Sequence, residues 1–203
     1  MWTAAFICGD CKHMERIEFL GRPVPLHRCG VLVIGSGCAA WNAADCLADL
    51  GVKDVLLVSE GLDMGTSRNT GSDKQTYYKL AMQARQPDSV DQMAEALAAG
   101  RSVHGDIAYA EAANSARCFL KLVGLGVPFP TNAYGEFVGY QTDHTTTRRA
   151  SSAGPLTSRY MTEALEQSVR RKPVTILDGV TIVELLPEIG RGLDGFSKGY
   201  VKD

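Results

Sequence analysis

A cluster of small residues in one short segment has the types and spacing that bind a phosphate group. The segment reads Gly-x-Gly-x-x-Ala and supplies the candidates Gly35, Ser36, Gly37, Ala39 and Ala40. The first glycine permits a sharp turn, the second leaves room for a pyrophosphate, and the alanine allows a helix to pack closely on a strand. The N–H groups and dipole of that helix attract phosphate oxygens. The segment therefore predicts a nucleotide-binding turn.

Two strands and a helix must hold this turn. Residues 31–34 are a continuous aliphatic run, typical of a strand buried on both faces of a parallel sheet. A helix is expected over about residues 38–50, and a second aliphatic run, 55–58, leads to Ser59 and Glu60. The Glu60 carboxylate can accept hydrogen bonds from ribose hydroxyls and disfavours a 2′-phosphate. This βαβ unit predicts FAD or NAD rather than NADP; the alternative is an α/β core that uses glycine only to turn.

A polar loop, residues 61–73, follows the acid and is too polar for a core. Its side chains are numerous enough to bind the phosphates and ring heteroatoms of a cofactor held by the preceding turn. The candidates are Thr66, Ser67, Asn69, Thr70 and Ser72. An ordinary solvated loop is the alternative.

A second polar segment runs from about residue 131 to residue 154. His144 could transfer protons, and Arg148 or Arg149 could bind a carboxylate through two hydrogen bonds. We interpret this segment as a candidate substrate or cofactor region, with a surface loop as the alternative. Cys8 and Cys11 have the spacing of a redox pair or half a zinc site, but the sequence has no second such pair, so incidental thiols are the simpler interpretation.

The composition is that of an ordinary globular protein, with 203 residues, 45% of them hydrophobic and 22% charged. A formal net charge of -2 gives no general attraction to nucleic acid or anionic lipid. No apolar run approaches the roughly 20 residues of a transmembrane helix, and the N-terminus lacks a signal-peptide core. We expect a cytoplasmic protein, and thiols inside the predicted helix favour a reducing compartment.

The remaining pattern completes an α/β fold. A hairpin is expected within residues 17–26, and strands over 174–177 and 180–186; helices are expected over 90–99, 105–125 and 156–169, with His104 as a capping or surface residue. The predicted class is a Rossmann-like FAD/NAD(P)-binding domain with a parallel sheet, incomplete at the C-terminus. The expected division is an arm and lead-in over residues 1–26, and the binding domain over residues 27–203.

Together these motifs resemble the N-terminal part of the succinate dehydrogenase/fumarate reductase flavoprotein family, which includes L-aspartate oxidase. The resemblance covers about Ile17 to the C-terminus and rests on the glycine turn through Glu60, on residues 65–72, on the turn at 154–157 and on the strands after Pro173. It implies that the loop from Thr66 to Ser72, with Gly71, lies along the FAD pyrophosphate and flavin. It also implies that the strand carrying Val180 and Thr181 passes near the adenine.

The resemblance also implies noncovalent FAD, because Asn69 stands where membrane-complex members carry the histidine that bonds FAD. It implies the FAD-binding portion of an oxidoreductase that moves a hydride between flavin and a small, carboxylate-bearing substrate such as fumarate, succinate or aspartate. Family members are longer and add a cap with catalytic Arg and His residues. We therefore assign no catalytic residue and no metal ligand, and expect a partner chain, an electron-transfer protein or further sequence to complete the enzyme.

Two alternatives belong to other classes. One is a non-catalytic nucleotide-binding module or degenerate fragment. The other is an NAD-dependent dehydrogenase built on the same βαβ motif, which the loop at residues 65–72 disfavours because simple NAD folds usually continue there with another βα unit.

Overall fold

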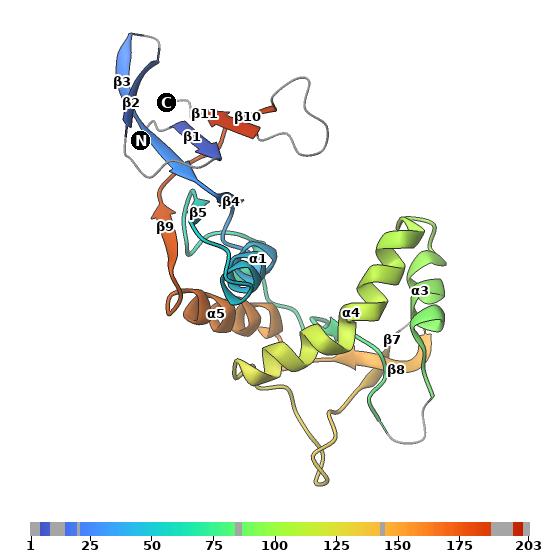
Figure 1. Ribbon diagram of the computed structural model, residues 1–203. Helices are drawn as coiled ribbons and strands as arrows, with labels where there is room; N and C mark the ends of the chain where they lie inside the picture. The colour runs from blue at the N-terminus through green and yellow to red at the C-terminus, as the bar shows by residue number, and fades with distance from the viewer. Residues whose placement is uncertain are drawn as a thin grey trace. The chain divides into compact units, whose positions relative to one another are not determined.

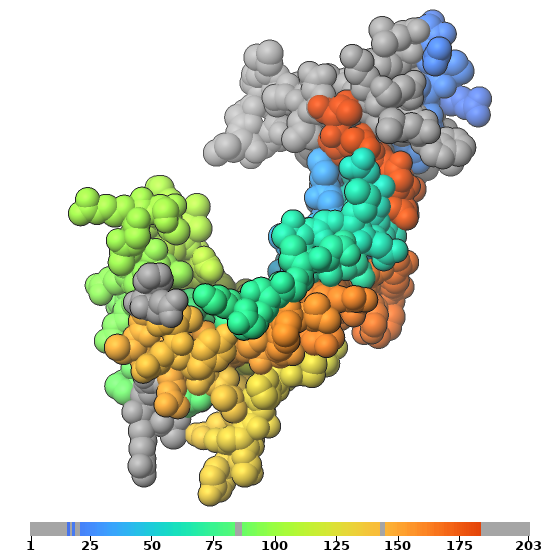
Figure 2. All heavy atoms as spheres, turned by 180° about the vertical axis from the view of Figure 1, so that it is seen from behind, coloured from blue at the N-terminus to red at the C-terminus, as the bar shows by residue number. Residues whose placement is uncertain are grey.

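The structure is a computed structural model that describes residues 5–8, 15–19, 21–83, 87–142, 145–187 and 197–200. The chain divides into two compact units, one formed by Met1–Asn69 with Leu165–Asp203 and the other by Thr70–Ala164. Figure 1 labels most of their elements, and the colours of Figure 2 follow the residue numbers in a space-filling view. The domain boundary expected at residue 26 stays a prediction.

A three-stranded parallel sheet lies at the centre of the first unit, as the sequence predicts. Its strands are β4 (Val31–Ile34), β5 (Val55–Ser59) and β9 (Val174–Asp178), in the order β4-β5-β9. Every residue of the central strand β5 is buried, because neighbouring strands and layers cover it on all sides. The register pairs Ser59 at the end of β5 with Asp178 at the end of β9.

Helix α1 (Cys38–Asp49) connects β4 to β5 and completes the predicted βαβ unit. Its buried face includes Trp41 and Ala44, both fully inaccessible to solvent. The Lys172 ammonium lies 2.6 Å from the buried Asp45 carboxylate, so an ion pair joins α1 to the turn that precedes β9.

A five-stranded sheet adjoins the parallel one within the same unit. Its order is β10-β11-β1-β3-β2, formed by β10 (Glu184–Pro187), β11 (Ser197–Tyr200), β1 (Ala5–Cys8), β3 (Arg22–Cys29) and β2 (Glu15–Phe19). Strands β2 and β3 form the antiparallel hairpin expected in the lead-in. The N-terminal arm contributes β1, which pairs in parallel with β3.

The second unit packs two helices with a small antiparallel sheet. The helices are α3 (Val90–Ala98) and α4 (Gly105–Gly124), and the sheet runs β6 (Tyr77–Tyr78), β8 (Thr145–Ser151) and β7 (Tyr140–Thr142). Ser89 caps α3 by accepting a hydrogen bond from the Gln92 amide, at the predicted helix start. His104 is exposed at the N-cap of α4, without a side-chain cap bond.

Two segments differ from the sequence expectation. Residues 145–151, interpreted as part of a polar loop, form strand β8, whose side chains alternate in exposure over the first four residues and are all buried over the last three. Residues 180–183, expected to begin a strand, lie outside any strand; only residues 184–187 form β10. The chain departs from a strand because Gly179 leaves β9 with a φ of 75° and the Val180 amide donates to the carbonyl of Ser59, a residue distant in the sequence, at 2.9 Å.

Two further helices complete the fold, the short α2 (Thr66–Asn69) and α5 (Thr157–Val169). The boundary between the units falls within α5. Among the residues that the structure describes, no helix is both long enough and apolar enough to cross a membrane.

Candidate functional site

A pocket of about 460 Å³ opens where the strands of the parallel sheet end, entirely within the first unit. Ligands of open α/β sheets bind at this edge. The pocket brings together seven residues that the sequence nominates, from three separate segments. They are Gly35, Ser36, Gly37, Ser59, Glu60, Val180 and Thr181; the other lining residues are Ile34, Val58, Gly61, Met64, Gly65 and Ile182.

The glycine turn has the backbone geometry that its sequence predicts. Gly35 adopts a φ of 108°, and its amide donates to the Val58 carbonyl at 2.7 Å, which holds the turn against β5. A Cβ atom at Gly37 would lie 3.2 Å from the Ser67 hydroxyl oxygen, a tight contact, so a glycine at this position favours the close approach of the turn and α2. Ala39 and Ala40 lie in the first turn of α1, where helix N–H groups have no carbonyl four residues before them.

Two buried serines join the ends of β4 and β5. The hydroxyl oxygens of Ser36 and Ser59 are 2.8 Å apart, and they lie 3.0 Å and 3.2 Å from the Gly61 carbonyl oxygen. Each hydroxyl has one proton, so one serine donates to the other and the second donates to Gly61. The side chain of Ser36 is therefore hydrogen-bonded within the fold, at the lining of the pocket. The role it has in the structure is to fix the turn that follows Glu60.

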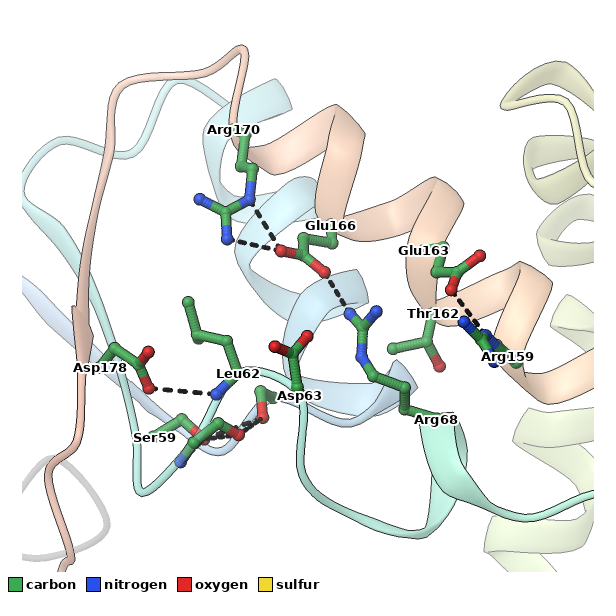
Figure 3. A network of polar contacts seen from close by, with 12 residues as sticks. Ser59, Leu62, Asp63, Arg68, Arg159, Thr162, Glu163, Glu166, Arg170 and Asp178 are labelled. Atoms are coloured by element: carbon green, nitrogen blue, oxygen red, sulfur yellow. Dashed lines mark hydrogen bonds and ion pairs between the residues drawn. The ribbon is translucent and has the colours of Figure 1, made fainter.

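Glu60 is exposed at the pocket, directly after β5. The next residues are held by the third strand of the sheet, because the Asp178 carboxylate accepts hydrogen bonds from the amides of Leu62, at 3.1 Å, and Gly179, at 2.9 Å. Figure 3 shows Asp178 reaching Leu62 beside Ser59. The segment after the acid is thus fixed by Ser36 in the turn after β4, by Ser59 at the end of β5 and by Asp178 at the end of β9.

Helix α2 places Ser67 against the start of α1. The Ser67 hydroxyl accepts a hydrogen bond from the Cys38 amide at 3.3 Å, so it caps α1, the helix that follows the glycine turn. Thr66 is exposed. Asn69 uses its side-chain amide within the loop, donating to the carbonyls of Asp63 at 2.6 Å and Gly65 at 3.2 Å.

Thr70, Gly71 and Ser72 belong to the second unit, whereas the pocket lining belongs to the first. The Ser72 amide donates to the Pro155 carbonyl at 3.0 Å. Gln75 donates to the Thr70 carbonyl at 3.3 Å and accepts from the Ser158 amide at 3.1 Å. These bonds order the segment beside the start of α5.

One ion-pair network next to the pocket was missed by the sequence reasoning. Arg68 of α2 forms an ion pair with Glu166 of α5, and Glu166 also pairs with Arg170 at 2.6 Å (Figure 3). The spacing of Glu166 and Arg170 on a helix signals their mutual pair. No local pattern signals the contact with Arg68, because 98 residues separate it from Glu166.

In the second polar segment, Arg149 binds a carboxylate of the protein itself rather than being available for a substrate. Arg149 is buried and donates to both carboxylate oxygens of Asp88, at 2.7 Å and 2.9 Å. Burial acts to raise the pKa of Asp88, but the hydrogen bonds and charge of Arg149 prevail and lower it; the same pair raises the pKa of Arg149. This guanidinium is engaged within the fold, which removes Arg149 from the candidates for substrate binding and leaves the exposed Arg148.

Other nominated residues fall outside the description. His144 and Cys11 lie outside the described residues, as does the side chain of Cys8. Within the described part of the chain, His, Cys, Asp and Glu side chains form no group of three or more that could hold a metal ion.

The sequence matches the FAD binding domain family over residues 30–198. No curated protein matches the chain. Among solved structures, it is similar to quinol fumarate reductase FrdA of E. coli, with a TM-score of 0.67 and 18% identity, covering 78% of this chain and 27% of that one.

The chain is also similar to the Mycobacterium smegmatis Sdh1 complex in the apo form, with a TM-score of 0.64 and 17% identity, covering 82% of this chain and 30% of that one. A third similar structure is 3-ketosteroid-delta4-(5alpha)-dehydrogenase from Rhodococcus jostii RHA1, with a TM-score of 0.59 and 18% identity, covering 86% and 42% of the two chains. At such identities the likeness shows the fold alone. The chain spans between 27% and 42% of the length of these structures.

Proposed function

Because this chain belongs to the FAD binding domain family, we propose that it is the FAD-binding portion of a flavin-dependent oxidoreductase and holds FAD noncovalently at the pocket of its first unit. The observation that carries the proposal is the pocket itself, where the glycine turn, the acid after β5 and the segment after β9 form one lining. FAD supplies hydride-transfer chemistry when bound, and the protein supplies binding and orientation.

The residues present fit the dinucleotide end of this cofactor. Gly37 has no Cβ atom to obstruct a pyrophosphate at the turn. The amides of Ala39 and Ala40, in the first turn of α1, can donate hydrogen bonds to that pyrophosphate. Glu60 is exposed at the pocket and suits ribose hydroxyls, while Val180 and Thr181 line the side on which the adenine would lie. The pocket volume of about 460 Å³ is within the range of small-molecule sites.

The loop residues extend the proposal toward the flavin. Thr66 and Ser67 on α2, and Thr70, Gly71 and Ser72 in the next segment, supply hydroxyls and backbone groups for the phosphate and flavin. Noncovalent attachment is supported by Asn69, because a carboxamide is not a nucleophile and its donors are engaged by the carbonyls of Asp63 and Gly65.

The proposed reaction is hydride transfer with a small, carboxylate-bearing substrate of the fumarate, succinate or aspartate kind. The fold likeness to a fumarate reductase supports this class, and Arg148 is the exposed arginine of its segment that could bind a carboxylate. A partner chain or electron-transfer protein and a cytoplasmic location are parts of the same proposal. The chain is also similar in fold to a steroid dehydrogenase. Turnover should therefore be assayed with both a dicarboxylate and a steroid.

A non-catalytic nucleotide-binding module is the second candidate. Glu60 is the only titratable side chain among the residues that line the pocket, and its proposed task is to bind ribose. Nothing in that lining is placed to donate or accept a proton during a reaction. This candidate predicts tight FAD binding without turnover of a dicarboxylate or a steroid.

The visible absorption spectrum of the purified chain tests the proposal. A flavin spectrum is expected, with FAD released in full on denaturation, because a covalent flavin would remain with the precipitated protein. Gly37→Val should abolish the spectrum, since its side chain fills the phosphate path, whereas Gly124→Val, at a glycine with nothing within 4 Å, should retain it. A colourless wild-type protein that also refuses added FAD would contradict the proposal.

A further inference from the structure

Arg68 and Glu166 connect the loop of the site to helix α5. Their side chains are only 11% and 13% exposed, so the ion pair is largely shielded from water. Arg170, the residue after the end of α5, binds the other carboxylate oxygen of Glu166 at 2.6 Å. Glu166 is therefore held between two arginines, and Figure 3 shows Arg68 reaching it from α2, whereas Arg170 directly follows the end of α5.

Helix α2 needs such an anchor. It has four residues, which is far below the length at which a helix is stable by itself. Its second residue, Ser67, accepts from the Cys38 amide at 3.3 Å and lies 3.2 Å from the position of a Cβ atom at Gly37. Arg68 is the next residue along the chain. A shift of α2 by a fraction of an ångström would therefore move Ser67 at the start of α1.

Ser67 also has a proton to offer. While its oxygen accepts from Cys38, its own O–H can donate to an oxygen of a phosphate bound at the start of α1. The direction of this second bond depends on where α2 sits. Arg68 itself is engaged by Glu166, so its charge is compensated within the fold instead of facing the pocket.

From these contacts we propose that Arg68 and Glu166 are positioning residues for the pyrophosphate: their ion pair sets the place of α2, and through it the Ser67 hydroxyl. The inference rests on the proposed function, because it takes FAD as the occupant. It assigns a specific part of the cofactor, since Ser67 lies at the glycine turn and not at the acid that suits the ribose.

The test measures the binding of a nucleotide and of the matching nucleoside to two variants of α5. ADP and adenosine are titrated calorimetrically into the whole chain carrying Glu166→Gln or Glu163→Gln. Glu163 is the matched control, because it also pairs with an arginine of α5, Arg159, at 2.8 Å. Glu166→Gln is expected to weaken ADP binding about tenfold and to leave adenosine unchanged; Glu163→Gln should change neither.

Ser67→Ala tests whether Glu166 affects ADP affinity through Ser67 or independently of it. If Glu166 acts through Ser67, the double variant loses no more ADP affinity than the larger of the two single losses. Additive losses would show that Glu166 acts independently of Ser67 and would overturn the proposal. Equal losses for ADP and adenosine, or an unchanged ADP affinity in a folded Glu166→Gln protein, would also overturn it.

Arg68→Lys is the second variant, for the case in which Glu166→Gln does not fold. It keeps the charge but loses the planar guanidinium, so a smaller loss confined to ADP is expected; no loss would overturn the proposal. FAD binding to the wild-type chain distinguishes a failure of the proposed function from a failure of this inference. Wild-type protein that binds neither FAD nor ADP refutes the proposed function together with this inference, whereas normal wild-type binding with an unaffected Glu166→Gln refutes the inference alone.

Discussion

Ser36 and Ser59 place their hydroxyl oxygens 2.8 Å apart, although 23 residues separate them in the sequence. Both side chains are buried, and both hydroxyl oxygens lie within hydrogen-bond distance of the Gly61 carbonyl. At the pocket, the ends of the βαβ unit are thus held together by side-chain hydrogen bonds as well as by the pairing of its strands. The turn that follows Glu60 is fixed before any ligand binds, which lowers the entropic cost of binding.

The serine contact predicts a measurable loss of stability. Ser36→Ala removes one donor and leaves the Gly61 carbonyl with Ser59 as its remaining side-chain donor. The free energy of unfolding should fall by about 1 kcal/mol, the usual net value of a buried hydrogen bond. Urea unfolding measures the change, with Ser102→Ala, at an exposed serine, as the control. A difference between the two variants below about 0.3 kcal/mol would contradict the prediction.

Glu60 is predicted to act in binding rather than in folding. Its side chain is exposed, so Glu60→Gln should leave the unfolding midpoint unchanged. The variant should weaken FAD binding about tenfold, because a neutral amide accepts ribose hydrogen bonds less strongly than a carboxylate. Asp63→Asn, at another exposed acid of the same loop, is the control and should bind FAD normally. Equal affinities for all three proteins would show that Glu60 does not contact the ribose.

Two glycines of the second unit predict opposite effects of the same substitution. A Cβ atom at Gly139 would lie 2.5 Å from the Arg148 carbonyl oxygen, which is backbone of β8 and cannot easily move. Gly139→Ala should therefore lower the unfolding free energy by about 2 kcal/mol. At Gly105, the first residue of α4, a Cβ atom meets nothing within 4 Å. Gly105→Ala should raise the unfolding free energy by about 0.5 kcal/mol. Thermal unfolding of both variants measures the difference.

The parts of the fold that sequence reasoning predicts are those set by local patterns. The aliphatic run at residues 55–58 becomes the fully buried strand β5, and Gly35 adopts the positive φ that the turn requires. Ser89 caps α3 at the predicted start. In each case the signal is a periodicity or a backbone requirement within a few residues, which the rest of the fold does not override.

The parts that it misses depend on distant contacts. Val180 belongs to an apolar, β-branched run that favours a strand, but its amide is taken by the Ser59 carbonyl, and the segment lines the pocket instead. Strand β8 has three threonines that suit a strand, but its charged residues favoured a loop. Arg149 could not be separated from Arg148 by sequence, because its partner Asp88 lies 61 residues away.

The buried pair of Asp88 and Arg149 predicts a specific dependence of stability on pH. Arg149 prevails over burial and holds the pKa of Asp88 below its usual value, about 3.9 in an unfolded chain. A carboxyl whose pKa is lower in the folded state stabilises the fold fully above the unfolded pKa. The contribution is lost as the pH falls through the folded pKa. The stabilisation by Asp88 should therefore be constant near neutrality and decline below about pH 4.

Asp88→Asn isolates this contribution, since it leaves Arg149 buried without an anionic partner. At pH 7 the variant should lose about 3 kcal/mol of unfolding free energy, as expected when one member of a buried pair is removed. The difference from wild type should shrink on acidification from pH 4 to pH 2, measured by urea unfolding at each pH. Asp73→Asn, at an exposed acid, should show a small difference at every pH. A gap between wild type and Asp88→Asn that stayed constant down to pH 2 would mean that the amide disrupts packing rather than the charge pair.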